Sequence, residues 1–249
     1  MRMQKFIAFL AFFLISLSFL SAQEEISREE IIVSEESAPF EQKKSSFPKI
    51  DSSLFFTFGP KLMLNTDDHT KSAPSPVMYS LGIGGDFLFP HDVLLEAHAS
   101  FFTNYYLWDG ERAQPAEVEN RTATALSAMI DLTGGCSWNT GKSQKNFFSA
   151  SGGLGIFVRH GILSNGVNPD DENRDTKTKA SDDVSSINDS FFNDLNFLYP
   201  ELAFSYSYIL SEIWKIGGEA RAYIPLGSLM NGNGVDGMIF SLALKLSYK

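Results

Sequence analysis

The chain has 249 residues and a formal net charge of −10, from 30 acidic and 20 basic residues. So acidic a chain repels nucleic acid, and no nucleic-acid partner is expected. Its single cysteine, Cys136, excludes an intramolecular disulfide framework and is predicted to be an inert thiol in a turn.

The amino terminus has the features of an export signal. Arg2 and Lys5 precede an apolar run, residues 6–20. This run is shorter than the ~20 residues of a membrane-spanning helix. Residues 1–22 are therefore predicted to be a secretory signal peptide. An uncleaved anchor is the alternative, because Leu20 is larger than the residue that cleavage sites favour there. The remaining residues suffice for one domain.

Residues 23–50 differ from the rest of the chain in composition. Glutamates crowd this segment, and it has few large apolar residues. Such a segment cannot bury enough surface to offset its ordering entropy. We expect a flexible, acidic periplasmic segment.

Eight stretches within residues 51–249 alternate between two kinds of side chain. One set of positions carries no charged residue, whereas the other carries small residues and charges of both signs. This alternation is typical of barrel strands with lipid outside and a polar lumen inside. The predicted fold class is all-β: an eight-stranded antiparallel transmembrane β-barrel with up-and-down topology. The predicted strands are 54–64, 77–89, 93–105, 122–132, 148–158, 198–208, 214–224 and 238–248.

The other face of the predicted strands holds five acidic and five basic residues. They are Lys61, Asp86, Glu96, Asp131, Arg159, Glu201, Lys215, Glu219, Arg221 and Lys245. A charge in a narrow lumen needs an opposite partner or a hydrogen bond. These residues are predicted to form an ion-pair network that plugs the barrel. A conducting or gated pore is the alternative interpretation.

The lengths of the connections indicate an orientation. With the amino terminus in the periplasm, the outer connections include the longest, residues 160–197, and residues 90–92 and 210–212 form short inner turns. The inner connection 133–146 is longer than this pattern favours. The acidic tract 165–194 has few large apolar residues and is predicted to be mobile and exposed at the cell surface.

Aromatic residues fall at the predicted inner ends of the strands on the lipid side, where they would form an interfacial girdle. They are Phe87, Phe89, Phe148, Tyr206, Tyr208, Trp214 and Tyr248. Two prolines within the predicted strands are unfavourable for a closed barrel, because proline has no N–H to donate to a hydrogen-bond ladder. We therefore expect a bulge at Pro60, and expect Pro200 in a strand portion above the membrane.

The closing strand resembles the assembly signal of small outer-membrane barrels. The matching residues are Leu242, Leu244, Leu246 and Tyr248, although Lys249 follows the terminal aromatic here. The architecture of residues 54–249 is similar to the OmpA transmembrane domain, OmpX and the OmpW family. Resemblance to OmpA and OmpX implies a closed lumen with surface or structural roles, and resemblance to OmpW implies passage of small hydrophobic molecules. The implied partners are outer-membrane lipid and the barrel-assembly machinery.

The sequence contains few candidate catalytic or metal-binding motifs. His98 and Ser100 share one face of the third predicted strand with Glu96, and a hydroxyl nucleophile needs such a base and acid. The pair is similar to the His-x-Ser of outer-membrane lipid A deacylases, where it faces lipid, whereas here it faces the lumen. The acidic loop around Asp170 lacks the glycine that a Ca²⁺-binding EF-hand loop requires. No catalytic, cofactor or metal site is predicted.

These observations predict a non-enzymatic protein of the bacterial outer membrane. Its barrel would anchor surface-exposed loops that serve envelope integrity or contact the environment or an extracellular or host ligand. One alternative is an OmpW-like narrow channel for small hydrophobic solutes, and another is an outer-membrane lipid-modifying enzyme. A third is a periplasmic lipocalin-like barrel, which would turn its apolar face inward.

Overall fold

The computed structural model describes residues 50–64, 77–117, 121–141, 143–173 and 176–249. The predicted signal peptide (1–22) lies outside these residues. So do the predicted acidic segment (23–50), except for Ile50, and the first outer connection, residues 65–76.

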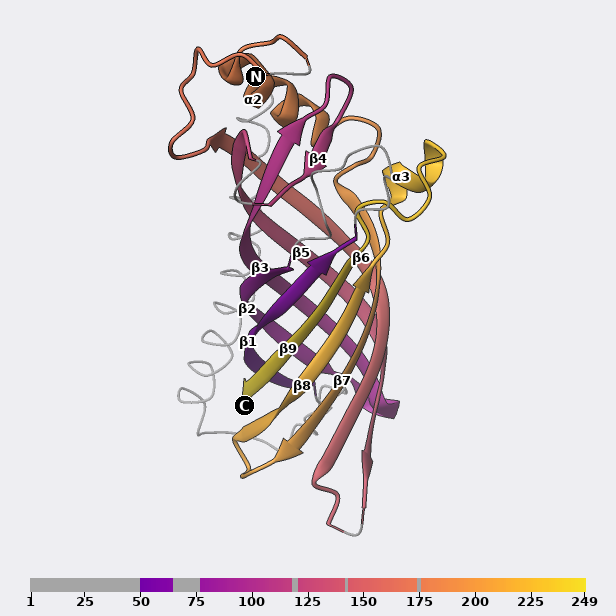
Figure 1. Ribbon diagram of the computed structural model, residues 1–249. Coiled ribbons are helices and arrows are strands. Elements are labelled where there is room, and N and C mark those ends of the chain that lie inside the picture. Colours follow the sequence, from indigo (N-terminus) through magenta and orange to yellow (C-terminus); the bar gives the residue numbers. More distant parts are fainter. Residues whose placement is uncertain (1–49, 65–76, 118–120, 142, 174–175) are drawn as a thin grey trace, which may run out of the picture. The chain divides into compact units, whose positions relative to one another are not determined.

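Eight long antiparallel strands close into a barrel (Figure 1). Each strand pairs with the next one along the ring, which closes where the first strand pairs with the last. A further short strand, β4 (Ala113–Pro115), pairs with the end of β3. The barrel strands are β1 (Asp51–Met63), β2 (Val77–Leu88), β3 (Val93–Trp108), β5 (Ala123–Thr140), β6 (Asn146–Leu163), β7 (Leu198–Ile209), β8 (Trp214–Tyr223) and β9 (Ile239–Tyr248). The predicted eight-stranded, up-and-down, all-β barrel is confirmed.

The two faces of the barrel strands differ as the alternation predicts. On β9, Leu244 is 69% exposed, whereas its neighbour Lys245 is 3% exposed. On β1, Phe56 and Phe58 are exposed and Phe55 is buried. A lipocalin-like barrel would bury its apolar side chains and expose its charges, so that alternative is wrong. The apolar outer band is the surface that a bilayer covers.

β5 and β6 are longer than predicted. They form a continuous ladder that ends at Thr140 and Asn146, so most of the predicted connection 133–146 is strand. Glycines and short polar residues occupy this extension, and such residues favour turns in a sequence. Cys136 therefore lies in β5 and is exposed, and the prediction that it lies in a turn is wrong.

Aromatic side chains gather at the inner ends of the strands. The ring centroid of Phe148 lies 5.0 Å from that of Tyr206 and 5.9 Å from that of Trp138, and Trp214 lies 5.0 Å from Tyr248. Amphipathic rings at this level suit the membrane interface. The longer β5 adds Trp138 to the predicted girdle.

The predicted bulge at Pro60 is absent. β1 pairs with β2 without an inserted residue from Asp51 to Leu62, and Pro60 faces Tyr79 in that ladder. On its other side, the pairing of β1 with β9 is interrupted at Gly59 and Pro60 and resumes in the same register. The missing N–H of proline thus opens a gap in one ladder, and the strand remains regular.

The inner connections are short. A 3₁₀ turn, η1 (Pro90–Asp92), joins β2 to β3. Residues 210–213 join β7 to β8, where the Ser211 hydroxyl oxygen accepts hydrogen bonds from the backbone N–H groups of Ile213 (3.4 Å) and Trp214 (3.2 Å). Because the inner turns are this short, the additional helices and the short strand lie in the outer connections.

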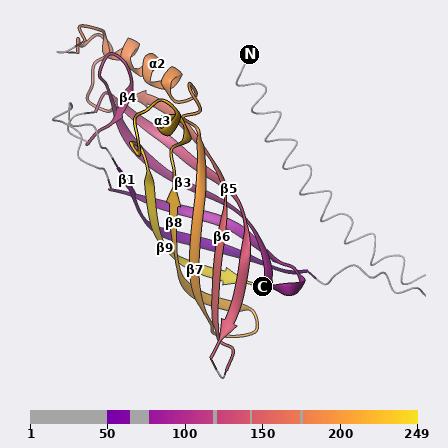
Figure 2. The same cartoon turned by 90° about the vertical axis from the view of Figure 1, so that its right-hand side faces the viewer.

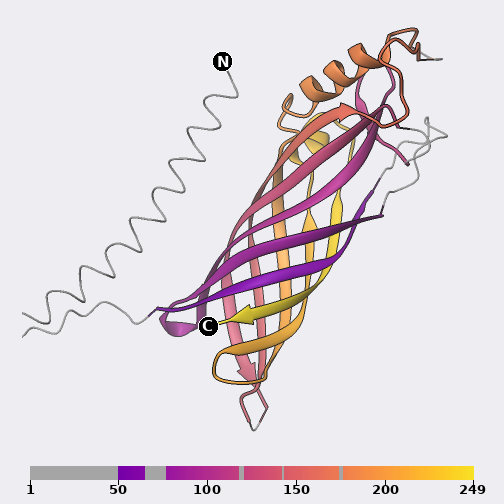
Figure 3. The same cartoon turned by 90° about the vertical axis from the view of Figure 1, so that its left-hand side faces the viewer.

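Two helices lie with β4 at the end of the barrel opposite these turns: α2 (Ala180–Ser190) and α3 (Leu226–Met230) (Figures 2 and 3). Among the described residues, no helix is long and apolar enough to cross a membrane. Ile187 and Phe191 are one helical turn apart and are both buried against the barrel rim. The tract 165–194, which was predicted to be mobile and exposed, thus contains a helix with a buried face.

Candidate functional site

Arg221 is the centre of the charged side chains in the lumen. Its guanidinium donates to Glu201 Oε1 (2.8 Å) and to both carboxylate oxygens of Glu219 (2.8 and 2.9 Å), and it also pairs with Glu96. Asp131 Oδ2 lies 3.8 Å from its Nη1. One buried cation from β8 thus holds four carboxylates, which come from four different strands.

Lys245 is the second cation at this level. Its ammonium donates to Glu96 Oε2 (2.7 Å) and Asp86 Oδ1 (3.2 Å), and lies 3.9 Å from Glu219 Oε2. The same ammonium lies 3.7 Å from the centre of the Phe55 ring. Glu96 bridges the two cations, so all of these charges belong to one buried network. Such pairing offsets the desolvation of each charge.

A hydrogen-bond chain extends this network across the lumen. His98 Nδ1 lies 3.0 Å from Asp131 Oδ2, and His98 Nε2 lies 3.1 Å from Thr57 Oγ1. The Tyr223 hydroxyl donates to the same Asp131 oxygen (3.0 Å). A Cβ at Gly82 would collide with Thr57 and His98, so the absence of a side chain there leaves room for the chain. We call the connected charged residues and His98 the charged layer. Its members are Asp86, Glu96, His98, Asp131, Glu201, Glu219, Arg221 and Lys245.

The order hydroxyl, imidazole and carboxylate is that of a nucleophile with its base and orienting acid. Sequence reasoning had paired His98 with Ser100 and Glu96, and the structure pairs it with Thr57 and Asp131 instead. Ser100 also faces the lumen, but its hydroxyl has no hydrogen-bond partner among the described residues. All these side chains are buried, and the Phe55 ring packs 5.5 Å from the His98 ring. The hydroxyl of Thr57, the imidazole of His98 and the carboxylate of Asp131 thus form a buried hydrogen-bond chain within the packed lumen.

Two of the remaining lumen bases contact aromatic rings. Lys61 Nζ lies 5.3 Å from the ring centre of Phe102 and 4.9 Å from that of Tyr223. Lys215 Nζ lies 4.3 Å from the ring centre of Phe147 near the inner end of the barrel. Neither lysine forms an ion pair with a described residue. Cation–π contacts take the place that the sequence interpretation gave to carboxylates.

Arg159 is the third base outside the charged layer. Its guanidinium donates to the Tyr106 hydroxyl (3.3 Å) and to the backbone carbonyls of Phe191 (3.3 Å) and Asn196 (2.8 Å). It lies between two rings, with its central carbon 4.4 Å from the ring centres of Phe157 and Phe191. Arg159 therefore ties the segment after α2 to the barrel wall.

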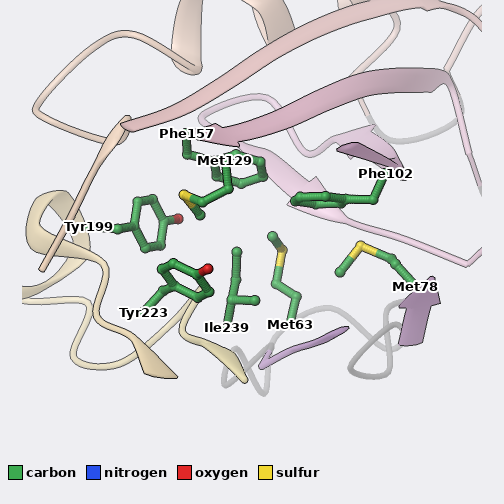
Figure 4. Packing of buried hydrophobic residues seen from close by; sticks show 8 residues of the cluster. All are labelled: Met63, Met78, Phe102, Met129, Phe157, Tyr199, Tyr223 and Ile239. Carbon is green, nitrogen blue, oxygen red and sulfur yellow. The ribbon is translucent and has the colours of Figure 1, made fainter. Parts of the chain in front are cut away.

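A second layer fills the lumen nearer to its outer end, and it is apolar apart from two tyrosine hydroxyls. Each of the eight barrel strands contributes one buried side chain to it. We call it the apolar layer, and its members are Met63, Met78, Phe102, Met129, Phe157, Tyr199, Tyr223 and Ile239. Figure 4 shows these side chains pointing toward one another from around the ring. This layer was not predicted from the sequence, because the inward positions of all strands were assigned to a polar lumen.

α2 is held on the barrel rim by its polar side chains. The Asn188 side chain accepts a hydrogen bond from the backbone N–H of Gly161 and donates one to its carbonyl, both at 2.8 Å. The buried Asp183 accepts hydrogen bonds from the Thr178 hydroxyl (2.5 Å) and the Asn173 amide (3.0 Å). These bonds satisfy groups that would otherwise be buried without partners.

A cavity of about 220 Å³ opens at the outer mouth of the barrel, above the apolar layer. The segment after α2, the connection between β8 and β9, and the β3–β4 hairpin all contribute to its wall. Its floor includes Tyr106, Arg159, Phe191 and Tyr199, all of which are buried. We call this space the outer cavity.

The closed ring of strands, the apolar outer band and the girdle define a small outer-membrane-type β-barrel. The protein accordingly belongs in the bacterial outer membrane.

No protein-family profile matches the chain, and no curated protein is similar to it in sequence. Among solved structures, neisserial surface protein A is similar with 7% identity and a TM-score of 0.48, over 81% of this chain and 99% of that one. The attachment invasion locus protein Ail of Yersinia pestis has 8% identity and a TM-score of 0.41, over 81% and 99%. The outer membrane protein AlkL has 9% identity and a TM-score of 0.39, over 86% and 96%. Similarities this small say nothing about activity.

Proposed function

We propose that the protein is a closed, non-enzymatic barrel that anchors its outer connections for contact with an extracellular, host or envelope partner. The observation that carries the proposal is the double filling of the lumen. The charged layer and the apolar layer lie one above the other, and the side chains of both are almost fully buried. Eight strands leave an interior that side chains can fill, so little space remains for a continuous water column.

The outer end of the barrel is the part that can meet a partner. There, α2, α3 and β4 form a folded cap, and the outer cavity opens between them. Binding residues are often on loops that a rigid scaffold positions. The proposal therefore assigns anchoring to the barrel and binding to the cap.

Conductance tests the closed lumen. Purified protein in planar bilayers should show no steady, large conductance. Replacing residues 165–194 by a short Gly-Ser linker should abolish partner binding by whole cells while the barrel still migrates as a folded species before boiling. An epitope inserted at the exposed Gly166 should be accessible on intact cells and confirm the orientation. A reproducible open pore that Glu219→Ala or Arg221→Ala alters would overturn the proposal.

A narrow channel for small hydrophobic solutes is the second candidate. One observation favours it: an apolar groove of about 510 Å³ runs along the outer wall beside the interrupted β1–β9 ladder, and Phe58, Pro60 and Leu242 line it. Uptake of a labelled alkane into vesicles that contain the protein, compared with empty vesicles, separates the candidates. Faster uptake supports the channel.

We also propose that the outward side chains of β9 are recognised by the barrel-assembly machinery. Leu242, Leu244, Leu246 and Tyr248 are all exposed on the lipid side, as recognition during assembly requires. Tyr248→Ala should slow membrane insertion in cells and leave spontaneous folding into detergent unchanged. Equal slowing of both would point to a defect in stability instead.

A further inference from the structure

The connection between β8 and β9 carries exposed apolar side chains at the outer end of the barrel. Leu229 and Met230 of α3 are 45% and 67% exposed, and Val235, further along the connection, is 44% exposed. Residues 222–235 include no charged residue. Exposed apolar side chains that lie close together usually mark a surface that a membrane or a partner covers.

This connection has a polar side as well as an apolar one. Its polar residues line the outer cavity: Ser228, Asn231 and Asn233. Gly227 is the buried residue of α3, and a Cβ at this position would collide with the backbone oxygen of Asp194 in the segment after α2. Leu229 and Met230 therefore lie on the face of α3 that this contact leaves exposed. A segment with one polar and one apolar side suits the boundary between water and lipid.

The level of α3 along the barrel matches the outer boundary of the bilayer. Tyr248 lies in the girdle at the inner end of β9. The 10 residues of β9 span roughly 26 Å along the membrane normal, at about 3.4 Å per residue and a tilt of about 40°. The apolar band of such barrels is about 25 Å tall. The connection therefore begins and ends where the hydrocarbon of the bilayer ends.

The apolar side of the connection continues the lipid-facing band of the strands. Phe240, near the outer end of β9, is exposed on the lipid side and pairs with Ala222 of β8. The next outward positions, just beyond these two strands, are Ile224 and Met238, and both are half-buried. Figures 1 and 2 show α3 beside the outer end of the barrel and nearer to the inner turns than α2. The surface that lipid covers on the strands thus extends to α3.

α2 differs from α3 in charge. Asp182 and Asp189 are exposed on α2, and residues 165–194 include eight acidic residues. Its apolar side chains Ile187 and Phe191 are buried against the barrel rim. Charged side chains are costly to remove from water, so α2 belongs on the aqueous side. The cap therefore has one part suited to water and another suited to lipid.

From these features we infer that α3 enters the outer leaflet of the membrane, where Leu229, Met230 and Val235 contact lipid acyl chains. The partner of this surface is lipid, because the surface is continuous with a band that lipid already covers. The connection holds one side of the cap at the membrane surface. This inference goes beyond the proposed function, since it gives α3 a membrane contact and leaves the acidic α2 to meet an extracellular partner.

A single fluorescent label measures the depth of α3. In the full-length protein with Cys136→Ser, a thiol introduced by Met230→Cys is labelled with the polarity-sensitive fluorophore NBD. The protein is placed in phosphatidylcholine vesicles, with iodide as the quencher in water or doxyl-labelled phosphatidylcholine as the quencher in lipid. We expect blue-shifted emission, strong quenching by the doxyl lipid and severalfold weaker quenching by iodide than at the control positions.

Two controls bracket this result. Asn233→Cys is the matched control, because Asn233 belongs to the same connection but lines the outer cavity. Asp182→Cys on α2 is the aqueous reference. The inference is overturned if iodide quenches the label at Met230 as strongly as the label at Asp182. It is also overturned if dilution of the protein in excess lipid removes the shielding, because a second copy of the chain then covers this face.

Proteolysis provides a second measurement without a label. Met230→Asp should let proteinase K cut residues 225–237 severalfold faster in vesicles, because a carboxylate keeps α3 out of the lipid. Asn233→Asp should leave the rate unchanged. The gel-mobility shift confirms that each variant is a folded barrel before the comparison. Equal rates for the two variants contradict the inference and leave the closed lumen of the proposed function intact, which only a stable conductance overturns.

Discussion

The charged and apolar layers block the same lumen by different means. In the charged layer, two cations pair with five carboxylates through contacts that depend on distance and direction. In the apolar layer, eight side chains from eight strands share a non-directional contact. The stability of the charged layer therefore depends on single residues, whereas that of the apolar layer is distributed around the ring.

Removing Arg221 is the strongest test of this difference. Arg221→Ala leaves Glu96, Glu201 and Glu219 without their main cation, and such a change in a buried network costs about 3–5 kcal/mol. We expect failed assembly or a large drop in the urea midpoint, measured by the mobility shift of the folded barrel on gels. Lys215→Ala is the control, because Lys215 contacts a ring near the inner end and should cost far less.

A cavity in the apolar layer should be tolerated better. Met129→Ala removes a fully buried side chain and should cost about 2–5 kcal/mol, but it leaves no unpaired charge. The barrel should still assemble, with a lower urea midpoint by the same assay. If Met129→Ala prevents assembly while Arg221→Ala does not, the contrast between the layers is reversed.

The lipid-facing side chains of the barrel should tolerate charge according to their depth in the bilayer. Leu244→Arg places a charge near the middle of the lipid-facing surface and should cost about 2–4 kcal/mol, whereas Val77→Arg at the outer strand end should cost about 0–1 kcal/mol. Both residues are strongly exposed on the outer face. Equal urea midpoints in lipid vesicles would contradict the placement of the bilayer.

The cap should respond most weakly. Asn188→Ala removes two hydrogen bonds to Gly161 at the barrel rim and should cost about 1–3 kcal/mol, mostly as local loosening of α2. We expect faster proteolysis within residues 165–194 and an unchanged urea midpoint of the barrel. Coupled loss of both would mean that cap and barrel unfold as one unit.

The sequence predicted the ring and its two faces because period-two alternation is a local property. The outward Leu244 and inward Lys245 follow from it directly. Which acid pairs with which base did not follow, because partners such as Glu96 and Arg221 are brought together only by closure of the ring. Lys61 and Arg159 were predicted to pair with carboxylates. In the structure Lys61 contacts aromatic rings, and Arg159 donates to backbone carbonyl oxygens.

Two other features escaped prediction for reasons of composition. Met63 and Phe157 are apolar residues on the inward face, and a rule that makes the lumen polar hides them. α2 lies in a tract whose acidic residues outnumber its large apolar ones, so the buried face formed by Val184, Ile187 and Phe191 has little weight in the composition of the tract. In both places contacts between distant parts of the chain decide which side chains are buried, and the average hydrophobicity of the segment does not.

The position of Cys136 allows the depth of the barrel in the bilayer to be measured. It is the only cysteine of the chain, and it stands exposed on the lipid side of β5, two residues from the interfacial Trp138. A nitroxide attached to this native thiol would report its immersion depth by electron paramagnetic resonance, from the balance of oxygen and aqueous relaxation agents. The position of the bilayer boundary can thus be measured without any amino-acid substitution.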